Sequence, residues 1–138
     1  MRVLGIDLGQ ERVGLAISDQ SGILAQPLAV LPAREDVLWP RLQAVVEEFG
    51  VTAVVVGLPL NMNGSRGPQA ERAELFAREA EERLHLPVHL WDERLTTRVA
   101  ERALIETGLS RRRRHGIVDK VAAVIILQGY LDRQAPHG

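Results

Sequence analysis

The sequence contains no cysteine among its 138 residues. Disulfides, thiolate chemistry and cysteine-ligated zinc or iron–sulfur centres are therefore excluded, and any metal ion must bind through oxygen or imidazole ligands. Long apolar runs are also missing, because no stretch approaches the roughly 18 residues that span a bilayer. The N-terminus lacks the basic start and apolar core of a signal peptide. We therefore expect a cytoplasmic protein without a membrane partner.

Lysine is nearly absent, and the charges that are present are unevenly distributed. Only Lys120 is a lysine among the 17 basic residues, and we assign this bias no function. Residues 71–82 hold five glutamates, whereas residues 111–114 are four consecutive arginines. The formal net charge of -1 does not decide between classes of partner, because nucleic-acid binding depends on where the basic residues gather.

Length and composition favour one globular domain. The chain has a mass of 15.3 kDa and is long enough to bury a core. Its hydrophobic residues, at 46%, and its charged residues, at 25%, are in ordinary globular proportion. We expect a single domain over residues 1–133, followed by a frayed tail over residues 134–138.

The first half of the sequence has the pattern of four β-strands. Residues 2–8, 12–18 and 23–31 are separated by short turn sequences and predict an antiparallel meander. Pro27 suits an edge strand or a bulge, since it cannot donate a hydrogen bond to a neighbouring strand. Residues 51–60 are continuously apolar, which is typical of a strand buried on both faces.

Helical periodicity alternates with the later strands. The predicted helices cover about residues 36–50, 68–84, 96–107 and 117–131, and the segment "LPVHLWD" is the fifth strand. In the second of these helices we expect the glutamates and arginines on the face away from the core. The pattern predicts an α/β protein with a five-stranded mixed sheet flanked by helices. We expect the strand order 3-2-1-4-5, with strand two antiparallel to its neighbours and strands four and five parallel to strand one.

Asp7 places a carboxylate inside the first apolar strand. An unpaired buried carboxylate costs several kcal/mol, so a fold retains one only with a compensating partner. Asp92 and Glu93 follow the fifth strand and Asp119 lies near the start of the last helix, so the predicted strand order brings these acids to one region. Carboxylates at such short separations repel one another unless a cation lies among them. One or two Mg²⁺ or Mn²⁺ ions are the natural choice. Two such ions about 4 Å apart can activate water and stabilise the leaving oxygen of a phosphodiester.

Each acid also has a simpler interpretation. Asp7 could be a turn residue that caps the connector at Gly9. Asp92 and Glu93 could interact favourably with the dipole of the next helix. Asp119 could do the same in the first turn of the last helix, or it could pair with the arginines that precede it.

Two segments carry side chains suited to phosphate or sugar. The arginine run, residues 111–114, could hold phosphates beside the metal ions, or it could be a solvated loop that prevents aggregation. The loop "GLPLNMNG" has too few glycines, and no following Lys-Ser or Lys-Thr, to be a Walker loop. Its Asn61 and Asn63, together with Ser65, could instead hydrogen-bond sugar or phosphate oxygens.

Four motifs stand in order along the chain: "GIDLGQERVGLAISD", "VVVGLPLNMNGSRGPQAER", "WDERLTT" and "VDKVAAVIILQGYLD". Together they resemble the YqgF family, described as Holliday junction resolvase-like proteins and as nucleases for the 5′ end of pre-16S ribosomal RNA. The match covers nearly the whole chain. The family commonly has Lys-Arg where this chain has Glu11 and Arg12, and commonly Asp where it has Asn63. We therefore expect position 63 to contribute hydrogen bonding rather than a negative charge.

The resemblance implies an RNase H-like fold and an acidic metal site. Asp7, Glu93 and Asp119 map onto the catalytic and metal-binding acids, with Asp92 as a reserve ligand. The candidate nucleic-acid-binding residues are Arg12, Asn61, Asn63, Arg94, Arg111, Arg112, Arg113, Arg114 and Lys120.

The leading functional hypothesis is a divalent-metal-dependent endonuclease, a hydrolase of phosphodiester bonds that processes the 5′ end of pre-16S rRNA. Its partner would be structured RNA, and its state a monomer or a homodimer. Cleavage of branched DNA is the alternative within the same chemistry. A second class is a non-catalytic module for ribosome assembly or transcription. A third is an actin-like ATPase, suggested by "GIDLG", although such proteins need two domains of this kind around the nucleotide.

Overall fold

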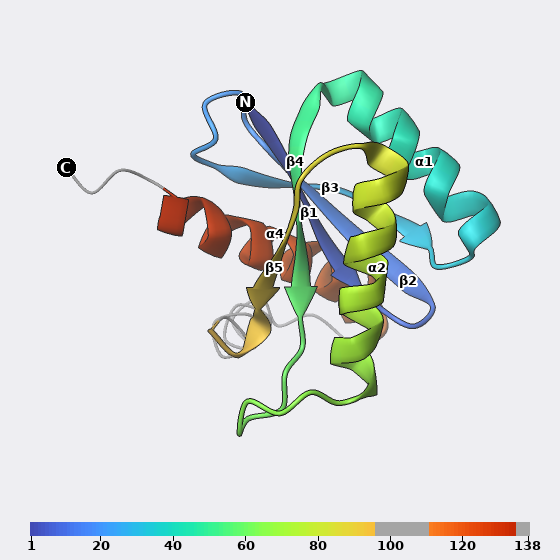
Figure 1. Ribbon diagram of the computed structural model, residues 1–138, viewed down its shortest axis with the longest axis vertical. Helices are drawn as coiled ribbons and strands as arrows, with labels where there is room; N and C mark the ends of the chain where they lie inside the picture. Colours follow the sequence, from blue (N-terminus) through green and yellow to red (C-terminus); the bar gives the residue numbers. More distant parts are fainter. Residues whose placement is uncertain (96–110, 135–138) are drawn as a thin grey trace.

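The computed structural model describes residues 1–95 and 111–134, and the side chains of residues 1–95 and 121–134. The strands in this part of the chain are β1 (Arg2–Leu8), β2 (Arg12–Ser18), β3 (Ala25–Pro32), β4 (Val51–Leu58) and β5 (Val88–Asp92). The helices are α1 (Glu35–Phe49), α2 (Pro68–Leu84) and α4 (Arg111–Gln134), and the 3₁₀ turn η1 (Glu93–Leu95) follows β5. Figure 1 shows the strands side by side in one sheet, with helices in front of it and behind it.

The five strands form one sheet in the order β3-β2-β1-β4-β5. β2 is antiparallel to β1 and to β3, whereas β4 is parallel to β1 and β5 is parallel to β4. The predicted strand order and directions are therefore confirmed. β1 lies at the centre of the sheet, and the carboxyl ends of β1, β4 and β5 share one edge of it (Figure 1).

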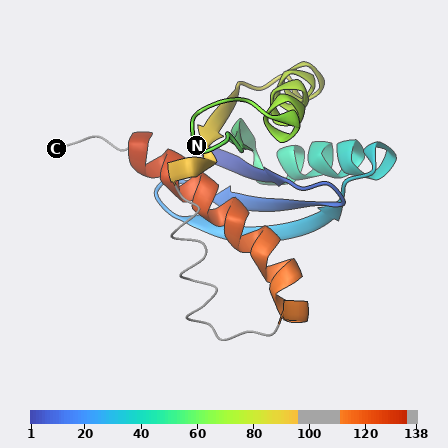
Figure 2. The ribbon, with the colours of Figure 1, turned by 90° about the horizontal axis from the view of Figure 1, so that it is seen from below.

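The side chains of β1 alternate between two hydrophobic cores, as the period of a strand requires. Leu4 and Ile6 pack in the core that α1 and α2 cover. Val3 packs on the opposite face, in the core that includes Ala123 and Leu127 of α4. Figure 2 shows α4 crossing one face of the sheet while α1 and α2 lie on the other. β1 is thus buried from both sides.

Helix α4 lies very close to the sheet because glycine occupies the contact point on β1. A Cβ atom at Gly5 would lie 2.7 Å from the Cβ of Leu127 and 3.2 Å from the carbonyl oxygen of Ala123. Real Cβ atoms essentially never show the shorter of these distances, so a side chain at position 5 would push the helix outward. The missing side chain sets the distance between α4 and the strands beneath it.

Pro27 lies on an edge strand and beside a bulge, so both of its predicted contexts are confirmed. β3 is the outermost strand, and its register against β2 shifts between Leu15 and Ala16. Gln128 of α4 holds the start of β3. Its side chain donates to the carbonyl of Ile23 at 2.8 Å and accepts from the amide of Ala25 at 2.9 Å.

Several predicted boundaries need correction. The third strand begins at Ala25 rather than at residue 23, and the fourth ends at Leu58 rather than at residue 60. Gln134 belongs to α4 rather than to the tail, and residues 135–138 lie outside the described part of the chain. The predicted helix over residues 96–107 also lies outside it.

The last helix begins six residues before its predicted start. α4 starts at Arg111, so the arginine run is helical and the interpretation as a loop is wrong. Arginine is a good helix former, and a helix tolerates Gly116 at a cost of about 1 kcal/mol. Asp119 is then two turns inside the helix. The helix-dipole interpretation of Asp119 is therefore wrong too, because that effect falls off beyond the first turn.

Among the described residues, no helix is long and apolar enough to cross a membrane.

Candidate functional site

Asp7 lies near the carboxyl end of β1, on the face of the sheet that α4 covers. Residues two apart in a strand share a face, and Asp7 therefore follows Val3 and Gly5. On one side it pairs with Gly14 of β2. On the other side Ile6 pairs with Val56, so the next position of β4 beside Asp7 is Gly57. Asp7 therefore has a glycine beside it on each of the two neighbouring strands.

Glu93 directly follows the last residue of β5, and its side chain lies over the sheet. Its side chain lies against Gly57, where an added Cβ would be 3.0 Å from the Cδ of Glu93 and 3.1 Å from its Cγ. The same Cβ would lie 2.6 Å from the Cδ1 of Ile126, so Glu93 and Ile126 of α4 both lie over Gly57. Gly57 therefore provides the space through which the carboxyl group of Glu93 approaches that of Asp7.

Burial and like charges raise the pKa of Glu93 to about 7. The largest cause is the loss of water around the carboxyl group, followed by the negative charges of Asp7 and then of Asp92. The ordinary value is 4.5, so Glu93 in the folded protein keeps its proton up to a higher pH than an ordinary glutamate does. Two acids at the carboxyl ends of different strands are therefore close enough to repel each other.

The pKa of Asp92 is shifted in the opposite direction from that of its neighbour Glu93. By strand alternation it points away from the α4 face, and its carboxylate accepts hydrogen bonds from the guanidinium of Arg94 at 2.7 Å and 3.0 Å. The amide of Arg94 donates to the same carboxylate at 3.0 Å. The hydrogen bonds from the guanidinium of Arg94 are the largest cause and lower the pKa of Asp92; burial opposes them, and the amide and charge of Arg94 lower the pKa further. The carboxylate of Asp92 is thus paired with Arg94.

Arg94 also contacts the loop between β4 and α2. Its Nη1 donates to the carbonyl of Met62 at 3.4 Å and would lie 3.3 Å from a Cβ placed on Gly64. Gly64 has a φ of +87°, a conformation that favours glycine. Arg94 therefore connects the end of β5 to this loop, residues 59–67, as well as carrying charge.

The polar side chains of that loop bond mainly to one another. The side-chain oxygen of Asn63 accepts from the amide of Ser65 at 2.9 Å and from its hydroxyl at 2.6 Å. The amide nitrogen of Asn61 donates to the same hydroxyl at 2.9 Å. Position 63 thus accepts hydrogen bonds within the loop, and these contacts give the loop a defined shape beside the acids.

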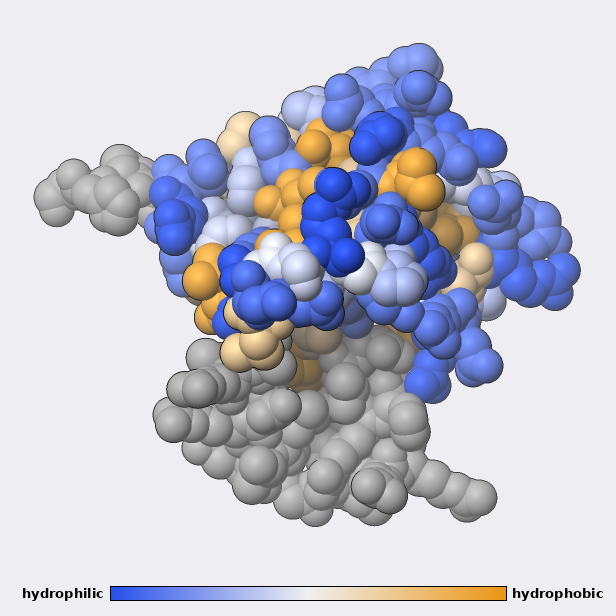
Figure 3. Space-filling view, turned by 60° about the horizontal axis from the view of Figure 1, so that its bottom comes forward, coloured by the Kyte–Doolittle hydropathy of each residue, from blue (hydrophilic) through white to orange (hydrophobic). Residues whose placement is uncertain are grey.

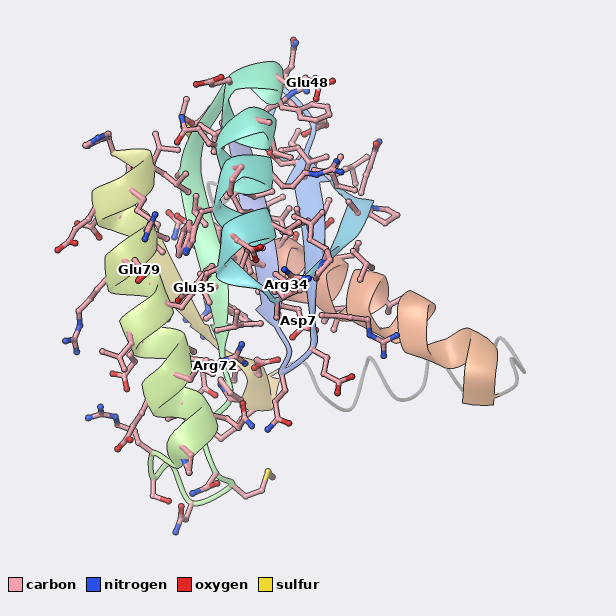
Figure 4. The ribbon with its side chains drawn as sticks, turned by 90° about the vertical axis from the view of Figure 1, so that its right-hand side faces the viewer. Asp7, Arg34, Glu35, Glu48, Arg72 and Glu79 are labelled. Carbon is pink, nitrogen blue, oxygen red and sulfur yellow. The ribbon has the colours of Figure 1, made fainter. Side chains whose placement is uncertain are left out.

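Arg72 is a further residue near the site, although the helical pattern predicts the arginines of its helix on the face away from the core. Its Nη1 donates to the carbonyl of Gly9 at 2.7 Å, across a sequence separation of 63 residues. Gly9 belongs to the connector between β1 and β2, in which its amide donates to the carbonyl of Arg12 at 3.0 Å. Figure 4 shows Arg72 on α2 and Asp7 on β1 at the same end of the sheet. Arg72 is the last residue of the motif "VVVGLPLNMNGSRGPQAER", and this membership is the signal that separates it from the other arginines of the helix.

Part of the predicted site lies outside the described side chains. Asp119, Lys120 and the arginines at 111–114 are on α4, but their side chains are not among those described. Within the described residues, no group of three histidines or acids is arranged to hold a metal ion. Figure 3 views the molecule from the edge at which β4 and β5 end, and the described surface there is mainly hydrophilic with smaller hydrophobic areas.

Known sequences match this chain over nearly its whole length. A family model described as "RuvX: Holliday junction resolvase" matches residues 1–133. A protein of Geobacillus kaustophilus is 50% identical over 135 residues, which cover 96% of this chain and 98% of the relative. A protein of Moorella thermoacetica is 50% identical over 139 residues and covers 100% of this chain and 99% of the relative. Both carry the name "Putative pre-16S rRNA nuclease".

Solved structures with the same architecture show the fold. The RuvC protein of Thermus thermophilus, solved in complex with a Holliday junction substrate, has a TM-score of 0.59 and 19% identity, covering 97% of this chain and 95% of that one. The Holliday junction resolvase of fowlpox virus has a TM-score of 0.56 and 11% identity, covering 98% of this chain and 100% of that one. The predicted RNase H-like fold is confirmed by this likeness.

The pKa of Glu93 predicts how stability depends on pH. Between about pH 4.5 and pH 7 the unfolded chain releases the Glu93 proton while the folded protein retains it, so the free energy of unfolding falls as pH rises through this window. Glu93→Gln removes the effect. In the presence of a chelator, the variant should be more stable than the parent above pH 7, by roughly 3 kcal/mol at most, and equal to it near pH 4. Urea unfolding across this range measures the difference, and coincident curves would contradict the prediction.

Asp92→Asn is the matched control because the adjacent acid has the opposite shift. The lowered pKa of Asp92 adds stability that is present above its unfolded pKa and is lost in acid. This variant should therefore be slightly less stable than the parent at neutral pH. The deficit should disappear below the pKa of the folded carboxyl group.

Gly57→Ala should displace Glu93. The added methyl group would overlap the side chains of Ile126 and Glu93, and the strain of such overpacking costs about 1 to 3 kcal/mol. A displaced Glu93 moves away from Asp7 and toward water, so its pKa should return toward 4.5. A carbon-detected NMR titration of the carboxyl groups measures this directly.

Gly5→Ala is the control for overpacking under the same helix. Its methyl group would meet Leu127 rather than an acid, so it should lower stability to a similar extent and leave the pKa of Glu93 near 7. Equal pKa values of Glu93 in the two variants would show that Gly57 does not control the approach of the acids.

Proposed function

The chain belongs to the RuvX (Holliday junction resolvase) family, and from this premise we propose that it is a divalent-metal-dependent endonuclease that processes the 5′ end of pre-16S rRNA. The observation that carries the proposal is the approach of Asp7 and Glu93 over Gly57, with the pKa of Glu93 raised to about 7. A fold that forces two carboxyl groups together gains from a cation between them. A cytoplasmic location, and a monomer or a homodimer, are part of the proposal.

The donor set fits Mg²⁺ or Mn²⁺. Hard divalent cations take oxygen ligands, and the chain has no thiolate to offer. Asp7 and Glu93 supply two carboxylates, and a complete site needs at least one more. We propose Asp119 of α4 as the third ligand and Asp92 as a reserve, because Asp92 is already bonded to Arg94. One or two bound ions would activate water and stabilise the leaving oxygen of a phosphodiester.

The basic residues around the acids would hold the nucleic acid. We propose that Arg12, beside the connector, and the α4 residues Lys120 and 111–114 contact phosphates. Arg94 is proposed to act mainly by fixing the loop after β4, because Asp92 already occupies much of its guanidinium. The loop residues Asn61 and Asn63 would then present a defined surface to sugar and phosphate.

The names of the relatives favour RNA as the substrate, whereas the family description favours branched DNA. Cleavage of four-way DNA junctions is therefore the second candidate activity. Purified protein should be incubated with labelled precursor 16S rRNA and with a labelled four-way junction, each with Mg²⁺, with Mn²⁺ and with chelator. We expect metal-dependent cleavage near the 5′ end of the mature rRNA sequence. Cutting of the junction alone would establish the second candidate, and binding of both without cleavage would favour a non-catalytic assembly factor.

Asp7→Asn should abolish cleavage while keeping the fold. The substitution preserves side-chain size but removes a negative charge from the proposed metal site, so metal-dependent cleavage should fall by at least about 100-fold. Glu93→Gln and Asp119→Asn should behave alike, and combining any two should add little because the site acts as a unit. Single-turnover cleavage at saturating metal measures the loss.

Asp36→Asn is the control for removing one carboxylate elsewhere. Asp36 lies on α1, is exposed, and pairs with Arg34 at 2.9 Å. This variant should cleave like the parent, and thermal unfolding without metal should show that the Asp7 variant is folded. An Asp7→Asn protein that cuts as fast as the control would remove Asp7 from the mechanism.

A further inference from the structure

We propose that Arg72 is a positioning residue, which fixes the β1–β2 connector and thereby the place of Asp7 at the end of β1. This inference rests on the proposed function, since it concerns the same acids. Nothing in the sequence motifs or in the comparisons assigns a role to Arg72. The proposal starts from its 2.7 Å hydrogen bond to the carbonyl of Gly9.

The connector depends on a few backbone contacts. The amide of Gly9 donates to the carbonyl of Arg12 at 3.0 Å, and a Cβ at Gly9 would lie only 2.4 Å from that same oxygen. At the other end, the amide of Ala33 donates to the carbonyl of Glu11 at 2.9 Å. Arg72 adds a hydrogen bond to the connector from outside the β1–β2 hairpin. Asp7 lies two residues before Gly9, so motion of the connector would move its carboxylate.

The bond from Arg72 is of a strong kind. A charged donor forms a hydrogen bond roughly twice as strong as a neutral one, and partial burial limits competition from water. α2 is a firm anchor for this bond, because Ala73 and Ala77 are buried against the sheet. The hydrogen bond from the guanidinium thus fixes the connector relative to the well-packed helix α2.

Arg72 reaches the connector from the face opposite the acids. It borders a pocket of about 180 Å³ between α1 and α2, which is also lined by Leu8, Trp39 and Phe76. Asp7 and Glu93, by contrast, lie on the α4 face. A phosphate held at the acids is therefore on the other side of the sheet from the Arg72 side chain. Arg72 acts on the site through the backbone of Gly9.

The test compares Arg72→Met with Arg78→Met. Arg78 lies on the same helix and is exposed, so the control removes an equal charge without touching the connector. Amide hydrogen exchange by NMR, without metal, reports the connector directly. We expect the Gly9 amide to exchange at least about 10-fold faster in the Arg72 variant, with core amides of β4 unchanged. Titration with Mn²⁺ should show weaker binding in the same variant alone.

Cleavage kinetics give the second readout. Misplacing a reacting group by about 1 Å can cost 100-fold in rate, so kcat of Arg72→Met should fall by about 10- to 100-fold while KM changes by less than about 3-fold. Arg72→Lys retains a charged donor and should recover part of the loss. If the parent and Arg78→Met do not cleave, the proposed function fails. Hydrogen exchange and Mn²⁺ binding then still test whether Arg72 positions the connector.

Three results would overturn the inference. Exchange at Gly9 that is the same in both methionine variants would show that Arg72 does not hold the connector. A raised KM with unchanged kcat would make Arg72 a direct substrate contact. Faster exchange in all core amides, with a large drop in melting temperature and no recovery in Arg72→Lys, would make it a structural residue only.

Discussion

The candidate site depends on one constraint, the burial of the Glu93 carboxyl group together with its electrostatic repulsion by Asp7. Asp7 is half-buried near the end of a centre strand, and the buried carboxyl group of Glu93 lies close enough to feel its charge. Such an arrangement persists only when the surrounding structure strongly determines it. In the proposed enzyme, the binding energy of a divalent cation offsets this repulsion.

Much of the surrounding structure serves to hold these acids. Gly14 and Gly57 flank Asp7 on the neighbouring strands, and Gly5 allows α4 to close over the same face. Arg94 pairs with Asp92 and also connects β5 to the loop after β4. These residues lie far apart in the chain, yet they meet at the edge where β1, β4 and β5 end.

The fold and the chemistry are separable in this protein. Structural relatives that share only 19% and 11% of their residues with the chain have the same architecture. A sheet with this strand order brings strand ends together whatever residues occupy them, and the reaction then depends on the side chains placed there. The helix α4 also shows the limit of local reasoning. Its start at Arg111 was missed because Gly116 and a run of charges resemble a loop, although neither prevents a helix.

The sequence by itself predicted the five strands, the two-sided burial of β4 and the presence of an acid within β1, because apolar periodicity and strand length are local properties. The strand order followed from three antiparallel strands and later strands that alternate with helices. The sequence also indicated that Asp7, Asp92, Glu93 and Asp119 form one group. Only the tertiary structure decided that Glu93 rather than Asp92 approaches Asp7, since alternation at the end of β5 sends the neighbouring acids to opposite faces. It alone showed the bond from Arg72 to Gly9, because a contact between residues 63 positions apart leaves no trace in local sequence pattern.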